Sequence, residues 1–433
     1  MPDLDSEYPQ NHKVTPNARE QYYREFIPSR QLFQWLNHSP VPSNDFTHRE
    51  LAFTFPKEDN SSETYYSRYQ SFPSHEAFRK ILIDKNPERF EIGPVYSVNP
   101  RDRRTVSKNI FYPVSKELVF DIDLTDYDNV RTCCSEGNIC RKCWQFITIA
   151  IKVMTEALKN DFGFKHILWV YSGRRGAHAW VCDAKARNLT DAQRSAIVSY
   201  LTVLGGTSGR KISSTRPWHP HISRSFETLN SRFVQTVLKT QDPWRDQGRV
   251  DELLSSIREQ KLKEELKKMW LTDPTAASST DKWKDIDTAY GMVVKAGTKS
   301  PSGWRTLKEL KQDIILEYSY PRLDVNVSKA LIHLLKSPFS LHPSTGRICV
   351  PIDPMHPESF DPLAVPTLEL IIHERDRSVR EEGLENVVQS RVTDADRTSL
   401  KPYVDVFTKF VQELSNDELH NAKRSREDEG LDF

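Results

Sequence analysis

Four cysteines crowded into one short stretch constrain this chain more than any other feature. They are Cys133, Cys134, Cys140 and Cys143, four of the six cysteines in 433 residues. Thiols do not persist as disulfides in a reducing compartment, so a cluster this tight indicates a metal site. Four thiolates suit tetrahedral Zn²⁺ and leave no open coordination position for catalysis. We therefore expect a structural zinc site, with an iron–sulfur cluster or reduced core cysteines as the alternatives.

Composition excludes several classes of protein. With 37% hydrophobic and 10% aromatic residues the chain can form a packed core, which excludes wholesale disorder. No apolar run approaches the ~18 residues that span a bilayer, and the first residues lack a signal-peptide core. We therefore expect a soluble, intracellular protein with no membrane contact. Because 61 Lys and Arg balance 60 Asp and Glu, any nucleic-acid binding must come from local basic patches.

The periodicity of apolar residues predicts a mixed α/β (α+β) fold. Strands are predicted where apolar residues alternate or form short buried runs, at residues 50–55, 65–72, 117–124, 166–172, 177–183, 321–328 and 341–353. Helices are predicted where the apolar spacing is helical, at residues 17–37 (two short helices broken near Pro28), 74–83, 144–158, 191–204, 251–270 and from 329 to about 336. Loose linkers are expected at 274–280 and 298–303.

Two aspartates on one predicted strand suggest a metal-dependent site. In ELVFDIDL, Asp121 and Asp123 are two residues apart and therefore project from the same face of the strand. Paired carboxylates are good ligands for Mg²⁺ or Mn²⁺. The same pattern places Asp324 on one face of the strand predicted at 321–328, and Glu50 on the polar face of its own strand. The alternative is that these polar faces simply meet water.

A short turn between two predicted strands suggests a phosphate site. Residues 172–178 read Ser-Gly-Arg-Arg-Gly-Ala-His, and the glycines allow a tight turn whose backbone and guanidinium groups can hold phosphate oxygens. An ordinary hairpin with solvated arginines is the alternative. Lys336 and His342 flank a predicted helix end, where a lysine can also just complement the helix dipole.

A basic loop at residues 209–226 is a third candidate. It surrounds Trp218 with arginine, lysine and histidine, a combination that suits a nucleic-acid backbone. A solvated charged loop is equally consistent with this composition.

Taken in order, the motifs resemble one family. The set RELAFTF, YSRYQSF, ELVFDIDL, the cysteine cluster, YSGRRGAHAWVCD, PRLDVNVS and LLKSPFSLHPSTGRICVPID is similar to the catalytic small subunit of eukaryotic DNA primase, in the archaeo-eukaryotic primase superfamily. The resemblance runs from about residue 17 to residue 415. It implies a nucleotidyltransferase that makes short RNA primers on DNA from ribonucleoside triphosphates and passes them to DNA polymerase alpha.

The resemblance also implies site residues. Asp121, Asp123 and Asp324 would hold two Mg²⁺ or Mn²⁺ ions, Glu50 would be a further acidic residue of the active site, and the four cysteines would bind zinc. The implied nucleotide-binding residues are Arg68, Ser172, Gly173, Arg174, Arg175, Gly176, Ala177, His178, His333, Leu334, Leu335, Lys336 and His342.

The implied architecture is a catalytic core of mixed sheets flanked by helices, with a helical subdomain. The expected parts are a flexible N-terminus (1–16), the first part of the core with the zinc motif (17–190), the helical subdomain (191–300), the second part of the core (301–415) and a disordered tail (416–433). The implied partners are a large primase subunit with an iron–sulfur domain, the catalytic and accessory subunits of DNA polymerase alpha, and single-stranded DNA, all in the nucleus.

Two other functions fit part of the pattern. An Asp-x-Asp pair also serves metal-dependent glycosyltransferases, although these often act in the secretory pathway. A zinc-stabilised nucleic-acid-binding protein would explain the cysteines and the basic loop without catalysis. An assay for template-dependent synthesis distinguishes a primase from a glycosyltransferase and from a nucleic-acid-binding protein.

Overall fold

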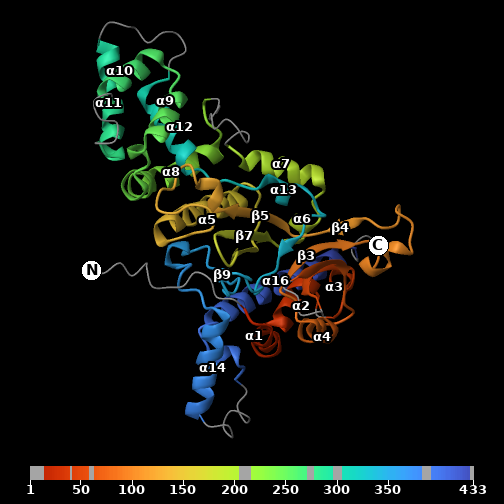
Figure 1. Cartoon of the computed structure of the whole chain (residues 1–433). Helices are drawn as coiled ribbons and strands as arrows, with labels where there is room; N and C mark the ends of the chain where they lie inside the picture. Colours follow the sequence, from red (N-terminus) through yellow and green to blue (C-terminus); the bar gives the residue numbers. More distant parts are fainter. Residues whose placement is uncertain are drawn as a thin grey trace. The chain divides into compact units, whose positions relative to one another are not determined.

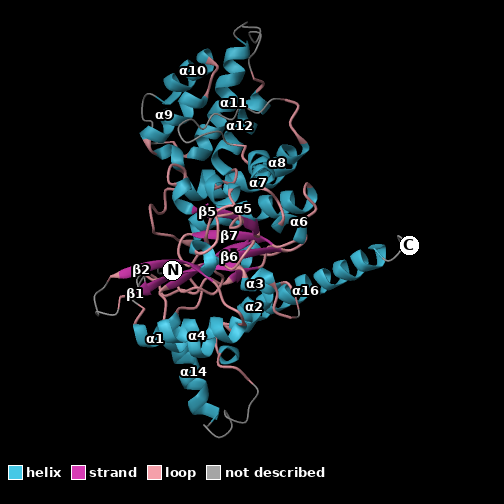
Figure 2. Ribbon diagram, turned by 90° about the vertical axis from the view of Figure 1, so that its right-hand side faces the viewer, coloured by secondary structure: helices cyan, strands magenta, loops and turns pink. Residues whose placement is uncertain are grey.

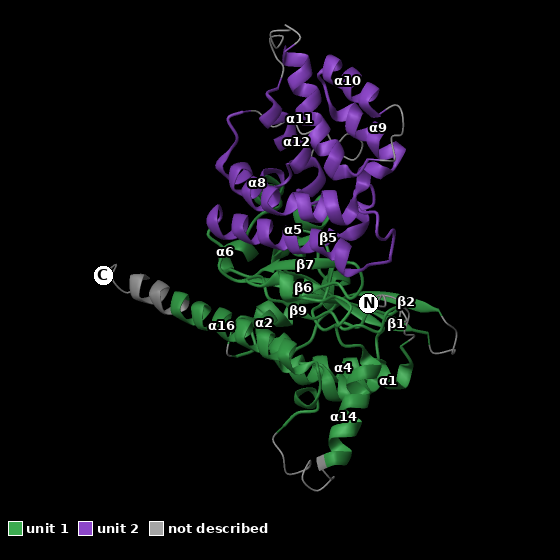
Figure 3. Cartoon of the chain, turned by 90° about the vertical axis from the view of Figure 1, so that its left-hand side faces the viewer, with its two compact units in different colours: residues 1–121, 163–198, 324–433 green, residues 122–162, 199–323 purple. Residues whose placement is uncertain are grey.

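The computed structural model describes residues 14–39, 41–57, 63–203, 216–270, 277–295, 305–382 and 392–429, with side chains up to residue 421. The predictions for residues 1–13, for most of the two linkers and for the first half of the basic loop lie outside these ranges. The chain divides into two compact units (Figure 3): unit 1 comprises residues 1–121, 163–198 and 324–433, and unit 2 comprises residues 122–162 and 199–323. The fold is mixed α/β, as predicted.

The first sheet of unit 1 has the order β2-β1-β3-β4, and β8 also pairs with β3. All of these pairings are antiparallel. The strands are β1 (Arg49–Pro56), β2 (Thr64–Gln70), β3 (Arg89–Tyr96), β4 (Pro113–Ser115) and β8 (Leu335–Lys336). Because β1 lies between two partners and is covered on both faces, Glu50, Leu51 and Ala52 are all buried. The prediction that this strand is half-buried, with Glu50 on a polar face, is therefore wrong.

The second sheet has the order β5-β7-β6-β9. Its strands are β5 (Leu118–Asp123), β6 (Ile167–Tyr171), β7 (Gly176–Val181) and β9 (Pro351–Ile352). Every residue of β6 and β7 is buried, which explains the continuous apolar run ILWVY. The two strands are antiparallel and joined by the predicted tight turn. The boundary between the two units falls inside β5, after Asp121.

Helices complete unit 1. They are α1 (Pro16–Gln21), a π-helical turn (Tyr22–Phe26), α2 (Ser29–Asn37), α3 (Asn44–Thr47), α4 (His75–Lys85), α6 (Ala184–Arg187), α7 (Asp191–Leu201, which runs into unit 2), α13 (Val325–Lys329), α14 (Leu368–Glu382) and α16 (Lys401–Glu429), with 3₁₀ turns at Pro100–Arg104, Pro357–Ser359 and Ala395–Arg397. Figure 2 shows α1 and α4 below strands β1 and β2. Trp35 of α2 contacts Trp180 and Phe407 edge to face, with ring centroids 5.3 and 5.8 Å apart, so α16 helps to close this core.

The described part of the C-terminal tail is helical. Residues 416–433 were expected to be disordered, whereas α16 continues to Glu429, and residues 430–433 lie outside the described ranges. Asp417 lies 3.0 Å from the imidazole of His166, and Glu418 pairs with Arg187 at 2.8 Å. These ion pairs secure a stretch whose composition alone is typical of disorder.

The segment around Asp324 differs from the strand predicted there. Residues 321–328 were predicted as a strand, but Asp324 is the N-cap of α13 and its Oδ1 accepts from the N–H of Asn326 at 3.0 Å. An aspartate that bonds to the backbone two residues on favours a helix start over an extended strand. The helix predicted from residue 329 to about 336 does not form, because α13 ends at Lys329 and Leu335 and Lys336 pair with β3.

Unit 2 is helical. After a 3₁₀ turn (Leu124–Tyr127) it contains α5 (Arg141–Asn160), α8 (Pro220–Phe233), a π-helical segment (Val234–Gln241), a 3₁₀ turn (Pro243–Arg245), α9 (Gln247–Ser256), α10 (Gln260–Trp270), α11 (Ser279–Lys295) and α12 (Leu307–Ser319). Figure 1 shows α10 and α11 side by side. The helix predicted at 251–270 is two helices, since Ile257 is extended and Glu259 is bound by Arg305 at 2.9 Å.

The contact-based units differ from the predicted parts in three places. Residues 122–162, with the cysteine cluster, and residues 305–323 pack with the helical unit, whereas residues 191–198 pack with unit 1. Residues 305–323 belong to unit 2 because α12 buries apolar residues such as Leu310 and Ile314. Within the described ranges, no helix has both the length and the apolar character needed to cross a membrane.

Candidate active site

The two aspartates of β5 lie at the end of a buried strand. Phe120 and Ile122 are fully buried, whereas Asp121 and Asp123 are partly exposed on the alternate face, as predicted. The Oδ1 atom of Asp123 accepts hydrogen bonds from the N–H and the hydroxyl of Thr125, both at 2.8 Å. This aspartate is therefore fixed where the strand becomes a 3₁₀ turn.

Asp324 comes to the same strand from a distant part of the chain. Its backbone N–H donates to the carbonyl oxygen of Asp121 at 3.1 Å. The imidazole Nε2 of His178, on the neighbouring strand β7, lies 3.6 Å from Asp121 Oδ1. Unit 1 therefore brings together three of the residues selected from the sequence, although Asp324 arrives at a helix cap and not on a strand.

The turn between β6 and β7 is built around Gly173. The Ser172 N–H donates to the Gly176 carbonyl at 2.9 Å, and the Gly176 N–H donates to the Ser172 hydroxyl at 3.0 Å. Gly173 has φ +89°, and a Cβ atom there would lie 2.7 Å from the Cβ of His342 and 3.1 Å from the Cys349 sulfur. Both the backbone conformation and the close packing require glycine.

Positive charge gathers beside this turn. The Lys336 ammonium, on β8, donates to the Ser172 carbonyl at 3.0 Å. The pKa of His342 falls to about 3 because burial disfavours its imidazolium and because Lys336, the two turn arginines and Arg89 add positive charge. The pKa of His178 also falls to about 3, through burial and then Lys336. Both histidines are therefore neutral at pH 7, and the region suits an anionic ligand.

Glu50 and Arg68 form a partly buried ion pair at one edge of the first sheet. The Glu50 carboxylate accepts from Arg68 at 2.9 and 3.2 Å, from the Tyr69 N–H at 3.1 Å and from the Tyr96 hydroxyl at 3.2 Å. Glu50 is fully buried, whereas the Arg68 side chain is 34% exposed. In this geometry Glu50 orients Arg68, which presents its free edge to solvent.

The remaining nucleotide-binding candidates follow α13. His333 and Leu334 lie between α13 and β8, and Leu335 begins β8 opposite Ile92. The Leu334 side chain packs so closely on Gly93 that a Cβ there would lie 2.6 Å from Leu334 Cδ2. Ala177 lies in β7 and is fully buried.

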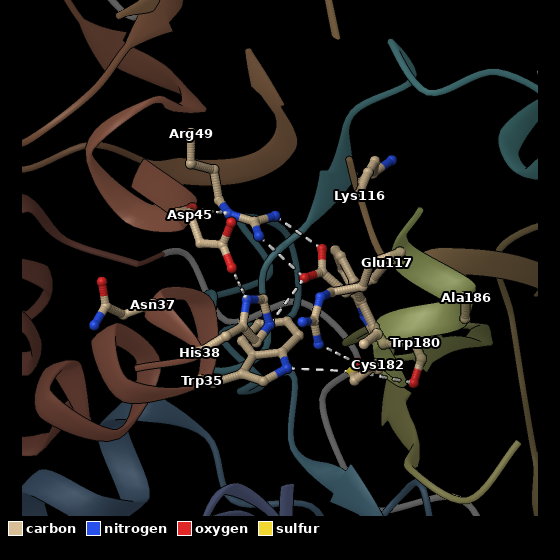
Figure 4. Close-up of polar contacts among 12 residues, drawn as sticks. Trp35, Asn37, His38, Asp45, Arg49, Lys116, Glu117, Trp180, Cys182 and Ala186 are labelled. Atoms are coloured by element: carbon tan, nitrogen blue, oxygen red, sulfur yellow. Dashed lines mark hydrogen bonds and ion pairs between the residues drawn. The ribbon is translucent and has the colours of Figure 1, made fainter. Parts of the chain in front are cut away.

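A buried charged cluster beneath this region was missed from the sequence. Arg49 donates to both oxygens of Glu117 at 2.8 and 3.1 Å, and His38 lies 3.5 Å from the same carboxylate (Figure 4). Although burial alone would raise it, these neighbours hold the pKa of Glu117 at about 2. The sequence signal was a charged pair at 49–50, the first residues of β1, and another at 116–117, directly before β5. Such a pair by itself indicates only the start of a strand.

The cysteine cluster lies in unit 2 at the start of α5. Its four sulfur atoms all lie within 4.8 Å of one another. The sulfurs of Cys140 and Cys143 are 3.9 Å apart, close to the roughly 3.8 Å expected for two thiolates that share a tetrahedral ion at ~2.3 Å. The Gln241 side chain accepts from the N–H of Thr132 at 2.8 Å and so ties the loop to the helical unit. The cluster could therefore hold a metal ion.

The second half of the basic loop makes internal contacts. Arg216 pairs with Asp313 at 2.8 Å, Arg224 pairs with Asp161 at 2.5 Å, and the imidazole of His221 lies 2.8 Å from the Tyr320 hydroxyl. In this structure these three side chains hold unit 2 together.

Comparison with known proteins identifies the family. A family model described as DNA primase small subunit matches residues 120–354. The chain is 47% identical to the DNA primase small subunit of Schizosaccharomyces pombe (95% of this chain and 92% of that protein) and 42% identical to that of Saccharomyces cerevisiae (96% of both). Identity to the Drosophila melanogaster protein is 35%, over 93% of this chain and 92% of that protein.

These matches place the chain among the primases, which are enzymes. More narrowly, it belongs to the DNA primase small subunit family. The resemblance inferred from the motifs is thereby confirmed.

Proposed function

We propose that this chain is a catalytic subunit that joins ribonucleoside triphosphates into short RNA primers on single-stranded DNA. The observation that carries the proposal is the meeting of Asp121 and Asp324 in the unit that also gathers Lys336 and the arginine turn. Carboxylates that bind divalent metal and cations that bind phosphate are the two kinds of group that phosphoryl transfer needs.

The carboxylates of Asp121, Asp123 and Asp324 are the groups that would hold Mg²⁺ or Mn²⁺, because both ions prefer oxygen ligands. Two bound ions would lower the pKa of the attacking 3′-hydroxyl and offset the charge on the leaving pyrophosphate. The main-chain bond between Asp324 and Asp121 keeps two of these residues together without using their carboxylates.

The chain's own cations would orient the nucleotide. The Ser172–Gly176 turn offers backbone N–H groups and the guanidinium groups of Arg174 and Arg175 to the triphosphate. Lys336 adds a charge at the base of the turn, and neutral His178 and His342 can donate hydrogen bonds without adding charge. Arg68, oriented by Glu50, would complete the nucleotide contacts.

The cysteine cluster and the partners belong to the same proposal. Four thiolates at tetrahedral spacing suit structural Zn²⁺. The relatives' name, small subunit, implies a larger partner. For this chain we expect a large subunit with an iron–sulfur domain, and transfer of the primer to the catalytic and accessory subunits of DNA polymerase alpha in the nucleus. The basic run at residues 423–426 is consistent with nuclear import.

Primer synthesis tests the proposal. The intact protein is incubated with poly(dT), labelled ATP and Mg²⁺ or Mn²⁺, beside Asp121→Ala/Asp123→Ala and a control, Asp251→Ala/Glu264→Ala, which removes two exposed carboxylates of α9 and α10. We expect short products from the intact protein and the control and none from the first variant. If the metal-loaded protein makes no primers, either alone or with its large subunit, the proposal is overturned in favour of a nucleic-acid-binding module.

A further inference from the structure

Lys116 lies at the junction between the two sheets of unit 1. It follows β4 and precedes Glu117 and β5, and it is fully buried. Its N–H donates to the Arg187 carbonyl at 3.0 Å. Arg194 donates to the carbonyl of Lys116 and, at 3.1 Å, to that of Glu117. The main chain is therefore held on both sides of the Lys116 side chain.

The Lys116 ammonium binds a main-chain oxygen. It donates to the carbonyl of His333, and among the described residues no carboxylate lies within 4.0 Å of it. Figure 4 shows the side chain directed away from the Glu117 carboxylate, which faces Arg49. Burying an ammonium without a paired carboxylate is costly, and an apolar side chain could fill the space. Among the described residues, the hydrogen bond to the His333 carbonyl is the direct contact that this amino group makes.

The bonded carbonyl belongs to the nucleotide-binding segment. His333 lies within electrostatic reach of Asp324 and Arg68, which both act on its imidazole, and its pKa is lowered first by burial and then by Lys116. Three residues further on, Lys336 contacts the Ser172 carbonyl of the arginine turn at 3.0 Å. A shift of the His333 peptide would therefore move groups that face the metal and phosphate sites.

Among the residues that the structure describes, this segment between α13 and β8 makes few polar contacts. The Leu331 N–H donates to Asp191 at 2.9 Å, and the His333 N–H makes a longer bond of 3.3 Å to Ala330. The bond from Lys116 ties His333 to the residues that lead into β5, the strand that carries Asp121.

We propose that Lys116 is a positioning residue for the incoming nucleotide: its buried amino group, which donates whether or not it is charged, fixes the His333 carbonyl and thereby the loop that presents His333 and Lys336. The inference rests on the proposed function. Burial and then the positive charge of Arg194 lower the pKa of Lys116 to about 7, although the carboxylates of Glu117 and Glu50 act in the opposite direction.

The test separates positioning from general stability. The variants are Lys116→Met, which keeps the volume without the donor, and Lys116→Gln, which keeps a neutral donor. The control is Lys282→Met in unit 2, because Lys282 is also fully buried and donates to a carbonyl, that of Ala277, at 2.8 Å. Each protein, in complex with its large subunit, extends an RNA primer on a DNA template at varied ATP, and binding of α,β-methylene-ATP with Mg²⁺ is measured at equilibrium.

We expect Lys116→Met to raise both the KM for ATP and the Kd of the analogue about tenfold, with a smaller rise for Lys116→Gln. The kcat should change by less than about threefold, since the metal ligands stay in place. Lys282→Met should lower the melting temperature and leave KM and Kd unchanged. If Lys116→Met does not fold, the KM for ATP and the Kd of the analogue measured for Lys116→Gln test the inference.

Two results would overturn the inference alone: wild-type KM and Kd in the folded Lys116 variants, or an equal rise in Lys282→Met. A wild-type complex that neither extends the primer nor binds the analogue would overturn the proposed function as well. The two failures are therefore distinguishable.

Discussion

The backbone N–H of Asp324 donates to the carbonyl oxygen of Asp121 at 3.1 Å, although the two residues are far apart in the sequence. The bond joins the cap of α13 to the strand that carries the Asp-x-Asp pair. Because it involves only main-chain atoms, this bond does not depend on the charge of the Asp324 side chain. Chemistry and placement can therefore be tested separately at this residue.

Asp324→Asn should abolish primer synthesis without unfolding the protein. Asparagine caps a helix as well as aspartate does, so the free energy of unfolding should change by less than about 0.5 kcal/mol. The loss of one anionic ligand should reduce activity roughly 100-fold or more. Asp246→Asn, at the N-cap of α9, is the control and should keep full activity. Substantial activity in Asp324→Asn would remove this residue from the metal site.

Gly173→Ala should weaken nucleotide binding. At φ +89° an alanine is strained, and its Cβ would press on His342 and Cys349. We expect a loss of about 1–3 kcal/mol in stability and a higher KM for nucleotide, measured by thermal unfolding and primer extension. Gly291→Ala, in α11, should instead increase stability. Its Cβ would meet no atom within 4 Å, so the free energy of unfolding should rise by about 0.5–1 kcal/mol. An unchanged KM in Gly173→Ala would argue against the turn as a phosphate site.

Cys140→Ser should release the metal ion. Its sulfur is one of four that lie within 4.8 Å, and a site with three thiolates binds zinc more weakly. Metal content after gel filtration should fall from one zinc per chain towards zero, with a lower melting temperature. Cys182→Ala removes a buried thiol that contacts Trp35 and should keep the metal. Full zinc content in Cys140→Ser would mean that the cluster is not the site.

The pKa of Lys116 predicts a pH dependence of stability. Burial and Arg194 lower it from 10.5 to about 7, so between these pH values the unfolded chain binds a proton that the folded chain lacks. Stability should therefore rise with pH from about 7 to 10.5, by at most about 5 kcal/mol, relative to Lys116→Met. Urea titrations of both proteins across this range measure the difference. Parallel pH profiles would mean that Lys116 keeps an ordinary pKa.

Local patterns predicted much of the fold. The alternation in ELAFTF and ELVFDIDL and the apolar run ILWVY marked β1, β5 and β6, because side-chain period reports directly on a strand. The turn at 172–176 followed from its glycines. Where a local signal competed with tertiary contacts the prediction failed: Asp324 capped a helix, Leu335 and Lys336 paired with β3, and Asp417 and Glu418 bound the core.

By itself, the sequence determined the residue types of the site: the carboxylates of β5, the arginine turn and four thiols within one short segment. Only the tertiary structure decided that Asp324 meets Asp121, that Glu50 is buried against Arg68, and that Lys116 holds the His333 carbonyl. The reason is physical. Local spacing fixes which face of an element a side chain occupies, whereas burial and partners depend on which distant elements pack against that face.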